Sequence, residues 1–297
     1  MRLSFRELLF DSRGEPLHLL SDKDHHSFQE NGFIHLPAVY QQEEIVSIRE
    51  ECGRVACGES APTEHLEDGF RSWRAVTTVS PELAGVACDP RLVGPAIQLL
   101  GPSLRLVGTQ LIYRAPHHGP RVVRTPERPG WHRDIYGMND DLDMSAPFCA
   151  VKCAIWLTDA VNVEDGATRF LPGSHKSGLP EIPPGQVDPP GWTSPIVRQG
   201  DVTVFENRTA HAGGLNTSDR LLIILMIQYG YRWLARVTRC AHPASLLSAV
   251  SPFARQILEP DEVDFAGRYC PGAGTAAIVA WARRLGIPYQ RQLSTVG

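Results

Sequence analysis

The sequence lacks any hydrophobic stretch long enough to cross a bilayer. No uninterrupted apolar run exceeds the length of the one over residues 221–227, whereas a membrane-spanning helix needs about 20 apolar residues. The charges of Arg6 and Glu7 interrupt the N-terminal segment, so the sequence predicts no signal peptide. We therefore expect a protein of the cytoplasm that has no membrane partner.

A strong charge of one sign and closely paired cysteines are also missing. The net charge is only −4 over 297 residues, which does not favour nucleic-acid binding, because that requires a basic face. The seven cysteines form no C-x-x-C pair, which argues against a zinc ribbon, a thioredoxin-type site and a secreted disulfide framework. A hydrophobic content of 42% with 21% charged residues is typical of a globular protein with a sizeable core.

The first third of the chain is predicted to be mainly helical. Ser21 can cap a helix over residues 22–31, and Gly32 can end it. The spacing of apolar residues predicts a further helix over residues 41–55. Two shorter helices are expected within residues 81–100, with a break at Asp89-Pro90.

From residue 104 onward the pattern changes to short strands separated by glycine and proline turns. The expected strands cover residues 104–115, 148–158, 166–171, 196–197, 202–205 and 221–231. Such a succession is typical of a β-sandwich or barrel. With helices preceding the strands, it indicates an α+β chain whose core is a β-barrel.

One short motif carries the first indication of chemistry. In W-H-R-D, His132 and Asp134 are two positions apart, which places both side chains on one face of an extended strand. An imidazole and a carboxylate side by side can hold a divalent metal. The pattern H-x-D alone is common by chance, and it more often marks a surface pair or a hydrogen bond in the core.

A later histidine strengthens the metal hypothesis. His211 follows the strand expected over residues 202–205 and stands beside small residues. Two histidines and one carboxylate leave coordination positions open, which is diagnostic of non-haem Fe(II) oxygenases. Arg220 can pair bidentately with a carboxylate of a co-substrate. The charges of Fe(II), Asp134, a 2-oxoglutarate dianion and Arg220 sum to zero, which lowers the free-energy cost of burying them.

Four stretches of the chain together resemble one enzyme family. They are W-H-R-D (131–134), E-D-G-A-T-R-F-L-P-G-S-H (164–175), G-D-V-T-V-F-E-N-R-T-A-H-A-G-G-L-N-T-S-D-R (200–220) and, near the start, F-Q-E-N-G-F-I-H-L-P (28–37). In this order they resemble the phytanoyl-CoA dioxygenase-like family of Fe(II)/2-oxoglutarate-dependent oxygenases. The resemblance covers residues 22–232.

The resemblance implies a mainly β (α+β) fold. Its core is a double-stranded β-helix, also called a jelly roll and similar to a cupin, with flanking N-terminal helices. We expect a single domain over residues 1–297. Within it, residues 1–103 form mainly helical support, residues 104–232 form the jelly-roll core with the metal site, and residues 233–297 wrap around that core.

The resemblance also implies roles for particular residues. Iron ligation falls to His132, Asp134 and His211, and binding of the distal carboxylate of 2-oxoglutarate falls to Arg220. Two further polar side chains are expected to contact the co-substrate, namely Thr168 in G-A-T-R-F and Gln110 on the preceding strand.

These residues predict an Fe(II)/2-oxoglutarate-dependent dioxygenase that uses O2 and releases succinate and CO2. The expected reaction is hydroxylation of a small molecule, with a place in specialised metabolism. Desaturation, epoxidation, rearrangement and endoperoxide formation remain open. Two other functions also remain alternatives: a metal-dependent hydrolase that activates water, and a non-catalytic jelly-roll module with a structural metal.

Overall fold

Two antiparallel sheets build the core of the structure, which is a computed structural model. In the part of the chain that it describes, a seven-stranded sheet has the order β1-β7-β5-β9-β4-β3-β2, and a two-stranded sheet pairs β6 with β8. The description covers residues 19–58, 61, 63–65, 69–119, 130–135, 141–142, 145–179, 181–237, 241–259 and 276–288.

Every strand pair in both sheets is antiparallel. Strands that are distant in sequence lie side by side, as β1 does beside β7. This arrangement confirms the expected double-stranded β-helix. The strands are β1 (Phe33–Leu36), β2 (Thr63–His65), β3 (Phe70–Arg74), β4 (Leu104–Arg114), β5 (Ala150–Trp156), β6 (Thr168–Phe170), β7 (Val202–Glu206), β8 (His211–Gly213) and β9 (Leu222–Tyr231).

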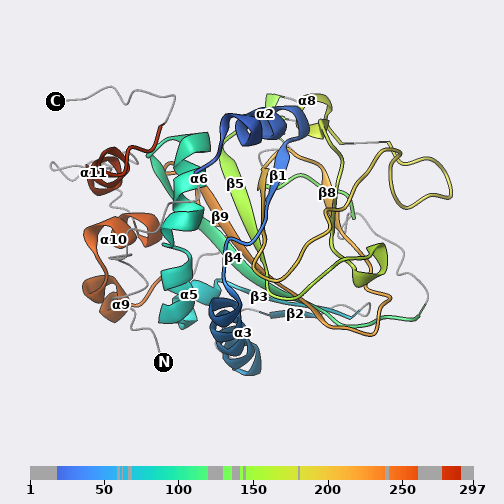
Figure 1. The fold of residues 1–297 in the computed structure, drawn as a ribbon, viewed down its shortest axis with the longest axis horizontal. Coiled ribbons are helices and arrows are strands. Elements are labelled where there is room, and N and C mark those ends of the chain that lie inside the picture. Colours follow the sequence, from blue (N-terminus) through green and yellow to red (C-terminus); the bar gives the residue numbers. More distant parts are fainter. Residues whose placement is uncertain are drawn as a thin grey trace.

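Helices cover one face of the larger sheet, with α5 and α6 against the strands and α9 to α11 further out (Figure 1). No helix among the described residues is both long and apolar enough to cross a membrane. The helices are α2 (Asp22–Asn31), α3 (Gln42–Cys57), α4 (Val76–Val79), α5 (Pro81–Val86), α6 (Pro90–Leu100), α8 (Ser174–Ser177), α9 (Ala244–Ala249), α10 (Pro252–Leu258) and α11 (Ala276–Arg284), with a 3-10 turn η2 (Val163–Asp165).

Strand β9 shows why the larger sheet carries an unbroken apolar run. Leu222 and Ile224 belong to the cluster that packs against the smaller sheet. Ile223 and Leu225 belong to the cluster shared with the helices. Because both faces of this strand are buried, the sequence shows continuous rather than alternating hydrophobicity.

The first helix ends as its sequence predicts. The Ser21 hydroxyl accepts a hydrogen bond from the Asp24 backbone N–H, and Gly32 closes the helix with a φ of +80°. A Cβ at Gly32 would overlap the Thr209 hydroxyl oxygen, which donates to the Gly32 carbonyl at 2.9 Å. This close approach holds the α2–β1 connection against the loop between β7 and β8.

Parts of the fold differ from the sequence-based expectation. The N-terminal region contributes β2 and β3 to the larger sheet, in addition to its helices and to β1, the short strand that the sequence predicts over residues 33–36. Residues 131–134 do not form the expected strand, because only His132 makes a bridge, to His211. Likewise Val197 makes one bridge to Ala160 rather than belonging to a strand. Such short pairings depend on which backbone lies opposite, and local propensity does not contain that information.

Candidate metal centre

The two candidate histidine ligands are joined through their backbones. His132 donates its N–H to the His211 carbonyl at 3.0 Å, and His211 donates to the His132 carbonyl at 2.9 Å. Residues directly opposite in an antiparallel bridge point to the same side. The two imidazole rings accordingly lie with their centroids 4.2 Å apart.

Asp134 completes the group. Its Oδ1 lies 3.8 Å from Nε2 of His211, and one ligand atom from each of the three residues lies within 4.8 Å of the others. Across the described ranges, no other set of three histidine, cysteine or acidic side chains comes together in this way. The structure thus unites the three residues that the sequence predicted as iron ligands.

Hydrogen bonds from the backbone orient both imidazoles. Nδ1 of His132 lies 3.2 Å from the Gly130 carbonyl, and Nδ1 of His211 lies 2.9 Å from the Thr209 carbonyl. A carbonyl accepts only, so each Nδ1 carries the proton and each Nε2 keeps its lone pair. Burial, together with neighbouring His132, lowers the pKa of His211 to about 3. The imidazole of His211 is therefore neutral at pH 7, as a metal ligand would have to be.

A lysine contacts the carboxylate of this group. Nζ of Lys152, on β5, lies 2.7 Å from Oδ1 of Asp134, and their side chains are only 15% and 8% exposed. Burial alone would raise the pKa of Asp134. The charge of Lys152 outweighs it, with help from the two histidines, and lowers that pKa to about 2. Asp134 is thus ionised across the physiological pH range, and an ionised carboxylate can coordinate a cation.

Aromatic rings enclose the histidine side of the centre. The ring of Phe205 on β7 lies 4.7 Å from the His211 ring, and that of Phe170 on β6 lies 6.1 Å away. Both phenylalanines are fully buried. These contacts keep water away from His211 and strengthen electrostatic interactions at the centre.

The remaining predicted co-substrate residues fall in different surroundings. Thr168 is buried on β6 opposite Gly213 of β8, two residues from His211. Gln110 is half-buried on β4 opposite Met226, and Met226 belongs to the cluster between the sheets.

Arg220 lies in the loop before β9. Its guanidinium donates to Oδ1 of Asp165 at 2.7 Å, and its side chain is 50% exposed. This hydrogen bond raises the pKa of Arg220. Asp165 also accepts from the backbone N–H groups of Val161 and Asn162. The contacts of Arg220 therefore tie two surface loops together.

Lys152 is the functional candidate that sequence reasoning missed. Its signal is present, since it is the one charged residue of β5, a strand otherwise made of alanine, valine, cysteine, isoleucine and tryptophan. A lysine inside a buried strand requires a partner. The sequence does not indicate that the partner is Asp134.

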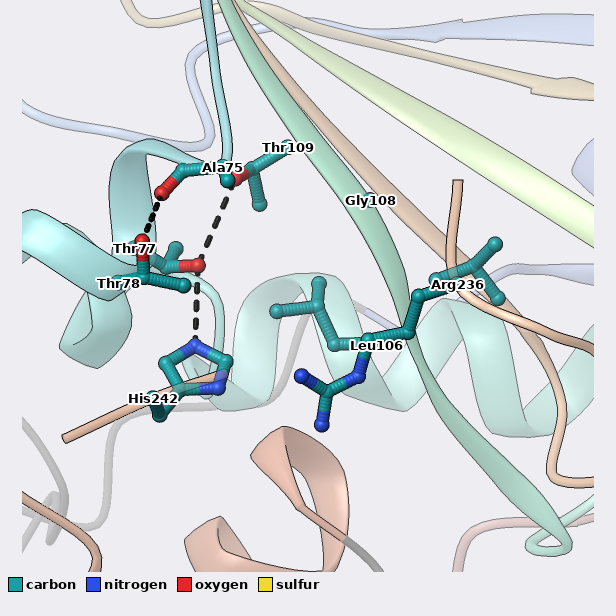
Figure 2. A pocket seen from close by; sticks show the side chains of 9 residues that line it. Ala75, Thr77, Thr78, Leu106, Gly108, Thr109, Arg236 and His242 are labelled. Atoms are coloured by element: carbon teal, nitrogen blue, oxygen red, sulfur yellow. Dashed lines mark hydrogen bonds between the residues drawn. The ribbon is translucent and has the colours of Figure 1, made fainter. Parts of the chain in front are cut away.

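A second region built around a histidine lies on the helix-covered side of β4. Its histidine, His242, lines a small pocket together with Leu106, a member of the hydrophobic cluster shared with the helices. Figure 2 shows Nε2 of His242 pointing to the Thr77 hydroxyl, at 3.1 Å, with Thr109 beyond it. On the other side of the ring, Nδ1 of His242 lies 3.5 Å from Oε1 of Glu259, which also pairs with Arg236.

A double-stranded β-helix that presents two histidines and one carboxylate is the arrangement of the non-haem Fe(II) oxygenases. The profile of one such family, described as phytanoyl-CoA dioxygenase (PhyH), matches residues 28–221. The chain therefore belongs to the phytanoyl-CoA dioxygenase family of Fe(II)/2-oxoglutarate-dependent oxygenases.

Individual curated relatives have low sequence identity to this chain. An ectoine dioxygenase from Bordetella bronchiseptica is 28% identical over 160 residues, which are 50% of this chain and 48% of the relative. The chain thus spans about half the length of that curated relative. The match leaves the activity of the whole protein to be argued from the site.

Two solved structures share the fold. The 2-oxoglutarate-dependent epimerase SnoN from nogalamycin biosynthesis has a TM-score of 0.56 at 24% identity, with 74% of this chain and 86% of that chain covered. HygX from Streptomyces hygroscopicus, with nickel, 2-oxoglutarate and hygromycin B bound, has a TM-score of 0.60 at 22% identity, with coverage of 76% and 94%.

Proposed function

We propose that this chain is an Fe(II)/2-oxoglutarate-dependent dioxygenase that hydroxylates a small molecule. The observation that carries the proposal is the convergence of His132, Asp134 and His211, with both imidazoles oriented through Nδ1. Family membership supports the same reaction class.

The donor set fits iron. Two neutral imidazole Nε2 atoms and one ionised carboxylate oxygen would hold Fe(II), leaving positions for co-substrate and O2. When bound, Fe(II) with 2-oxoglutarate and O2 supplies the oxidising power, and one oxygen atom enters the substrate while the other enters succinate, with loss of CO2. The chain supplies ligands, charge and exclusion of water.

Neighbouring side chains prepare these ligands. The Gly130 and Thr209 carbonyls hold the proton of each histidine at Nδ1. Lys152 holds Asp134 ionised and in place in a buried site, where a lone carboxylate would otherwise favour its protonated form. Phe170 and Phe205 exclude water from His211.

A small-molecule substrate in specialised metabolism is the second part of the proposal. The named relative is an ectoine dioxygenase, and the two structural neighbours are tied by their names to nogalamycin biosynthesis and to bound hygromycin B. All three names refer to small organic molecules. Because these molecules differ from one protein to the next, hydroxylation of a small molecule is proposed without a particular compound.

The direct test is anaerobic titration of the metal-free chain with Fe(II) and then 2-oxoglutarate. We expect one equivalent of iron to bind and a weak visible charge-transfer band to appear only after 2-oxoglutarate is added. On admission of O2, succinate should form slowly without substrate and faster when a correct substrate is present.

His132→Ala and His211→Ala serve as matched variants, because each removes one ligand and leaves the rest of the buried site. Both should lose the band and succinate formation. Stoichiometric Zn(II) binding with ester or amide hydrolysis would instead favour the metal-dependent hydrolase. Tight metal binding with no response to 2-oxoglutarate would favour a structural metal.

A further inference from the structure

The outer face of the smaller sheet, which points away from the metal centre, carries a cluster of its own. Side chains alternate along extended backbone, so the neighbours of the two histidines lie on this outer face. Trp131 precedes His132 and Ala212 follows His211, and both belong to one buried hydrophobic cluster. Because His132 is opposite His211 in an antiparallel bridge, Trp131 is opposite Ala212. On the other side of β8, Arg169 is opposite the same alanine.

Asp188 links the tryptophan to the arginine. Its Oδ1 accepts a hydrogen bond from Nε1 of Trp131 at 3.0 Å, and its Oδ2 accepts one from Nη1 of Arg169 at 2.5 Å. The side chains of Arg169 and Asp188 are only 7% and 16% exposed. The two donors stand on either side of Ala212, so the carboxylate reaches across β8. It joins the segment of His132 to β6, and these are the two neighbours of the strand that carries His211.

Asp188 belongs to a long loop between α8 and β7, called here the 181–194 loop. Its first part, residues 181–187, is mostly exposed. Further along, the backbone of Thr193 exchanges two hydrogen bonds of 2.8 Å with Phe170 on β6. The ring of Trp192 lies 4.9 Å from Cζ of Arg169. The exposed part of the loop is therefore followed by attachments to the outer face of the smaller sheet, beginning with the Asp188 carboxylate.

The two histidines of the metal centre differ in how firmly their backbones are held. His211 lies in β8, all of whose residues pair with β6. Among the described residues 130–135, His132 is the one that pairs with the sheet, through a single bridge. A segment held at one bridge can rotate about it. The hydrogen bond from Trp131 to Asp188 attaches the segment at a second point, one residue away, and so restricts the direction of the His132 ring. Metal ligands need such outer support, because small displacements weaken coordination.

Packing alone does not call for a carboxylate at this place. The cluster beneath it consists of alanines, leucine and tryptophan, and an apolar side chain would cover them without the free-energy cost of burying a charge. A carboxylate offers two separate acceptor oxygens. At Asp188 each oxygen takes a donor from a different segment, which suits a cross-link between those segments.

We propose that Asp188 is a positioning residue of the metal centre, which holds His132 in its ligand direction through Trp131 and couples the 181–194 loop to metal binding. This inference rests on the proposed function, because it takes His132 as a ligand. The coupling is reciprocal by thermodynamic necessity. If the attached loop favours metal binding, then a bound metal favours the attached loop.

Isothermal titration of the metal-free full chain with Fe(II) under argon tests the positioning role. Asp188→Asn keeps the size of the side chain but replaces one acceptor oxygen by an NH2 group, so it cannot accept from both donors as the carboxylate does. We expect one equivalent of iron to bind with about 10-fold lower affinity, the lower end of the effect of removing an outer partner of a ligand. Trp131→Phe keeps an aromatic ring in the cluster, loses only the indole donor and should have the same effect.

The double variant shows whether the two residues act through one hydrogen bond. If they do, Asp188→Asn combined with Trp131→Phe should bind Fe(II) about as weakly as either single variant. Two independent effects would instead multiply to about 100-fold. This non-additivity is not expected of two residues that merely stabilise the fold.

Asp201→Asn is the matched control. Asp201 is also a loop carboxylate with little exposure, 8% for its side chain, and it accepts from the backbone N–H groups of Ala38 and Arg198 where β1 meets β7. Its replacement should lower stability in urea unfolding and leave Fe(II) affinity at the wild-type value.

Hydrogen exchange followed by mass spectrometry tests the coupling to the loop. The N–H of Gln186 donates to the Pro183 carbonyl, and the N–H of Thr193 donates to Phe170. In the wild type under argon, Fe(II) should slow the exchange of peptides that contain these amides by up to about 10-fold, the same factor that Asp188 adds to metal affinity. In Asp188→Asn this slowing should disappear from the 181–194 loop and persist in peptides that contain His211.

The outcomes separate the inference from the function beneath it. Wild-type Fe(II) affinity in Asp188→Asn and Trp131→Phe, or an equal loss in Asp201→Asn, would overturn the positioning role. Exchange in the loop that does not respond to iron would overturn the coupling. Should Asp188→Asn not fold, Trp131→Phe and exchange in the wild type still decide. If the wild type binds no iron, the proposed function fails and this inference fails with it.

Discussion

Two of the described regions that place a histidine against a carboxylate differ in their surroundings, and only one of these two gathers three potential metal ligands. At the metal centre, each histidine uses Nδ1 to donate to a backbone carbonyl. In the pocket of Figure 2, His242 has the Thr77 hydroxyl at Nε2 and Glu259 at Nδ1. Nε2 of His242 therefore faces a hydroxyl, and Nδ1 faces a carboxylate that already pairs with Arg236.

The carboxylates differ in the same way. Glu259 pairs with Arg236 and accepts from the backbone N–H of His242, so it is surrounded by donors that hold it in place. Asp134 meets a lysine and the two imidazoles of His132 and His211. The comparison teaches that a histidine beside a carboxylate is not by itself a metal site, because three ligand atoms must come together.

The largest difference between the regions should appear on removing a histidine. His211→Ala deletes one of three ligands, so we expect Fe(II) affinity to fall at least about 100-fold and succinate formation to be lost. His242→Ala is the matched control, which should lower stability but bind iron like the wild type. Isothermal titration with Fe(II) under argon measures both. Equal iron affinity in the two variants would contradict the assignment of His211, and not His242, as a metal ligand.

Replacing Lys152 tests how the partner of the Asp134 carboxylate affects stability and metal binding. Lys152→Met leaves Asp134 buried without its ammonium partner, so the metal-free protein should lose about 3 kcal/mol of stability. Removing a positive charge also favours cation binding, so Fe(II) should raise the melting temperature more than in the wild type. Thermal melts with and without Fe(II) measure both effects. A reduced metal-induced shift would mean that the positioning of Asp134 by Lys152 outweighs the repulsion between Lys152 and the metal ion.

Glu259 should stabilise the fold in a pH-dependent manner. Burial would raise its pKa, but His242 and Arg236 lower it from 4.5 to about 2. The folded-state pKa lies below the unfolded one, so the stabilisation is complete above about pH 4.5 and is lost as the pH falls towards 2. Its size is on the order of 3 kcal/mol.

Glu259→Gln tests this contribution against the wild type. Urea unfolding at a series of pH values should show a difference in unfolding free energy that is constant near pH 7 and shrinks below about pH 4.5. Subtracting the two curves cancels the titration of Asp134, which is common to both proteins. A difference that stays constant down to pH 2 would contradict the lowered pKa.

The smallest effect is expected at Thr77. This residue is 2% exposed, and its hydroxyl lies 3.1 Å from His242 and 3.4 Å from Thr109. Thr77→Val keeps the shape but removes these hydrogen bonds, so stability should fall by about 1–2 kcal/mol. Iron binding and 2-oxoglutarate affinity should be unchanged. An altered iron affinity would show that the two regions are coupled.

Much of the fold could be predicted from local pattern. The capped helix α2, the two helices α5 and α6, and the long strands β4 and β9 all follow from spacing, caps and apolar runs. Some of the short elements could not be predicted. Strands β2 and β3 form only because β4 lies beside them, and the His132 bridge forms only because His211 lies opposite.

The amino-acid sequence by itself determined the residue types of the proposed metal centre. His132, Asp134 and His211 stand in motifs whose order and composition mark the family, and a set of two imidazoles and a carboxylate has few chemical uses. Their identity needs no coordinates, because the preference of iron for these donors is a property of the side chains.

Tertiary structure alone decided which positively charged side chains lie near those three residues. Lys152 meets Asp134 through the placement of β5 against the loop after His132. Arg114 reaches Gly213 because the register of β4 on β9 sets it opposite Leu222. Charges at these positions act over a few ångströms, whereas Arg114 and Gly213 are far apart in the chain. Only the packing of the two sheets brings such distant residues within that range.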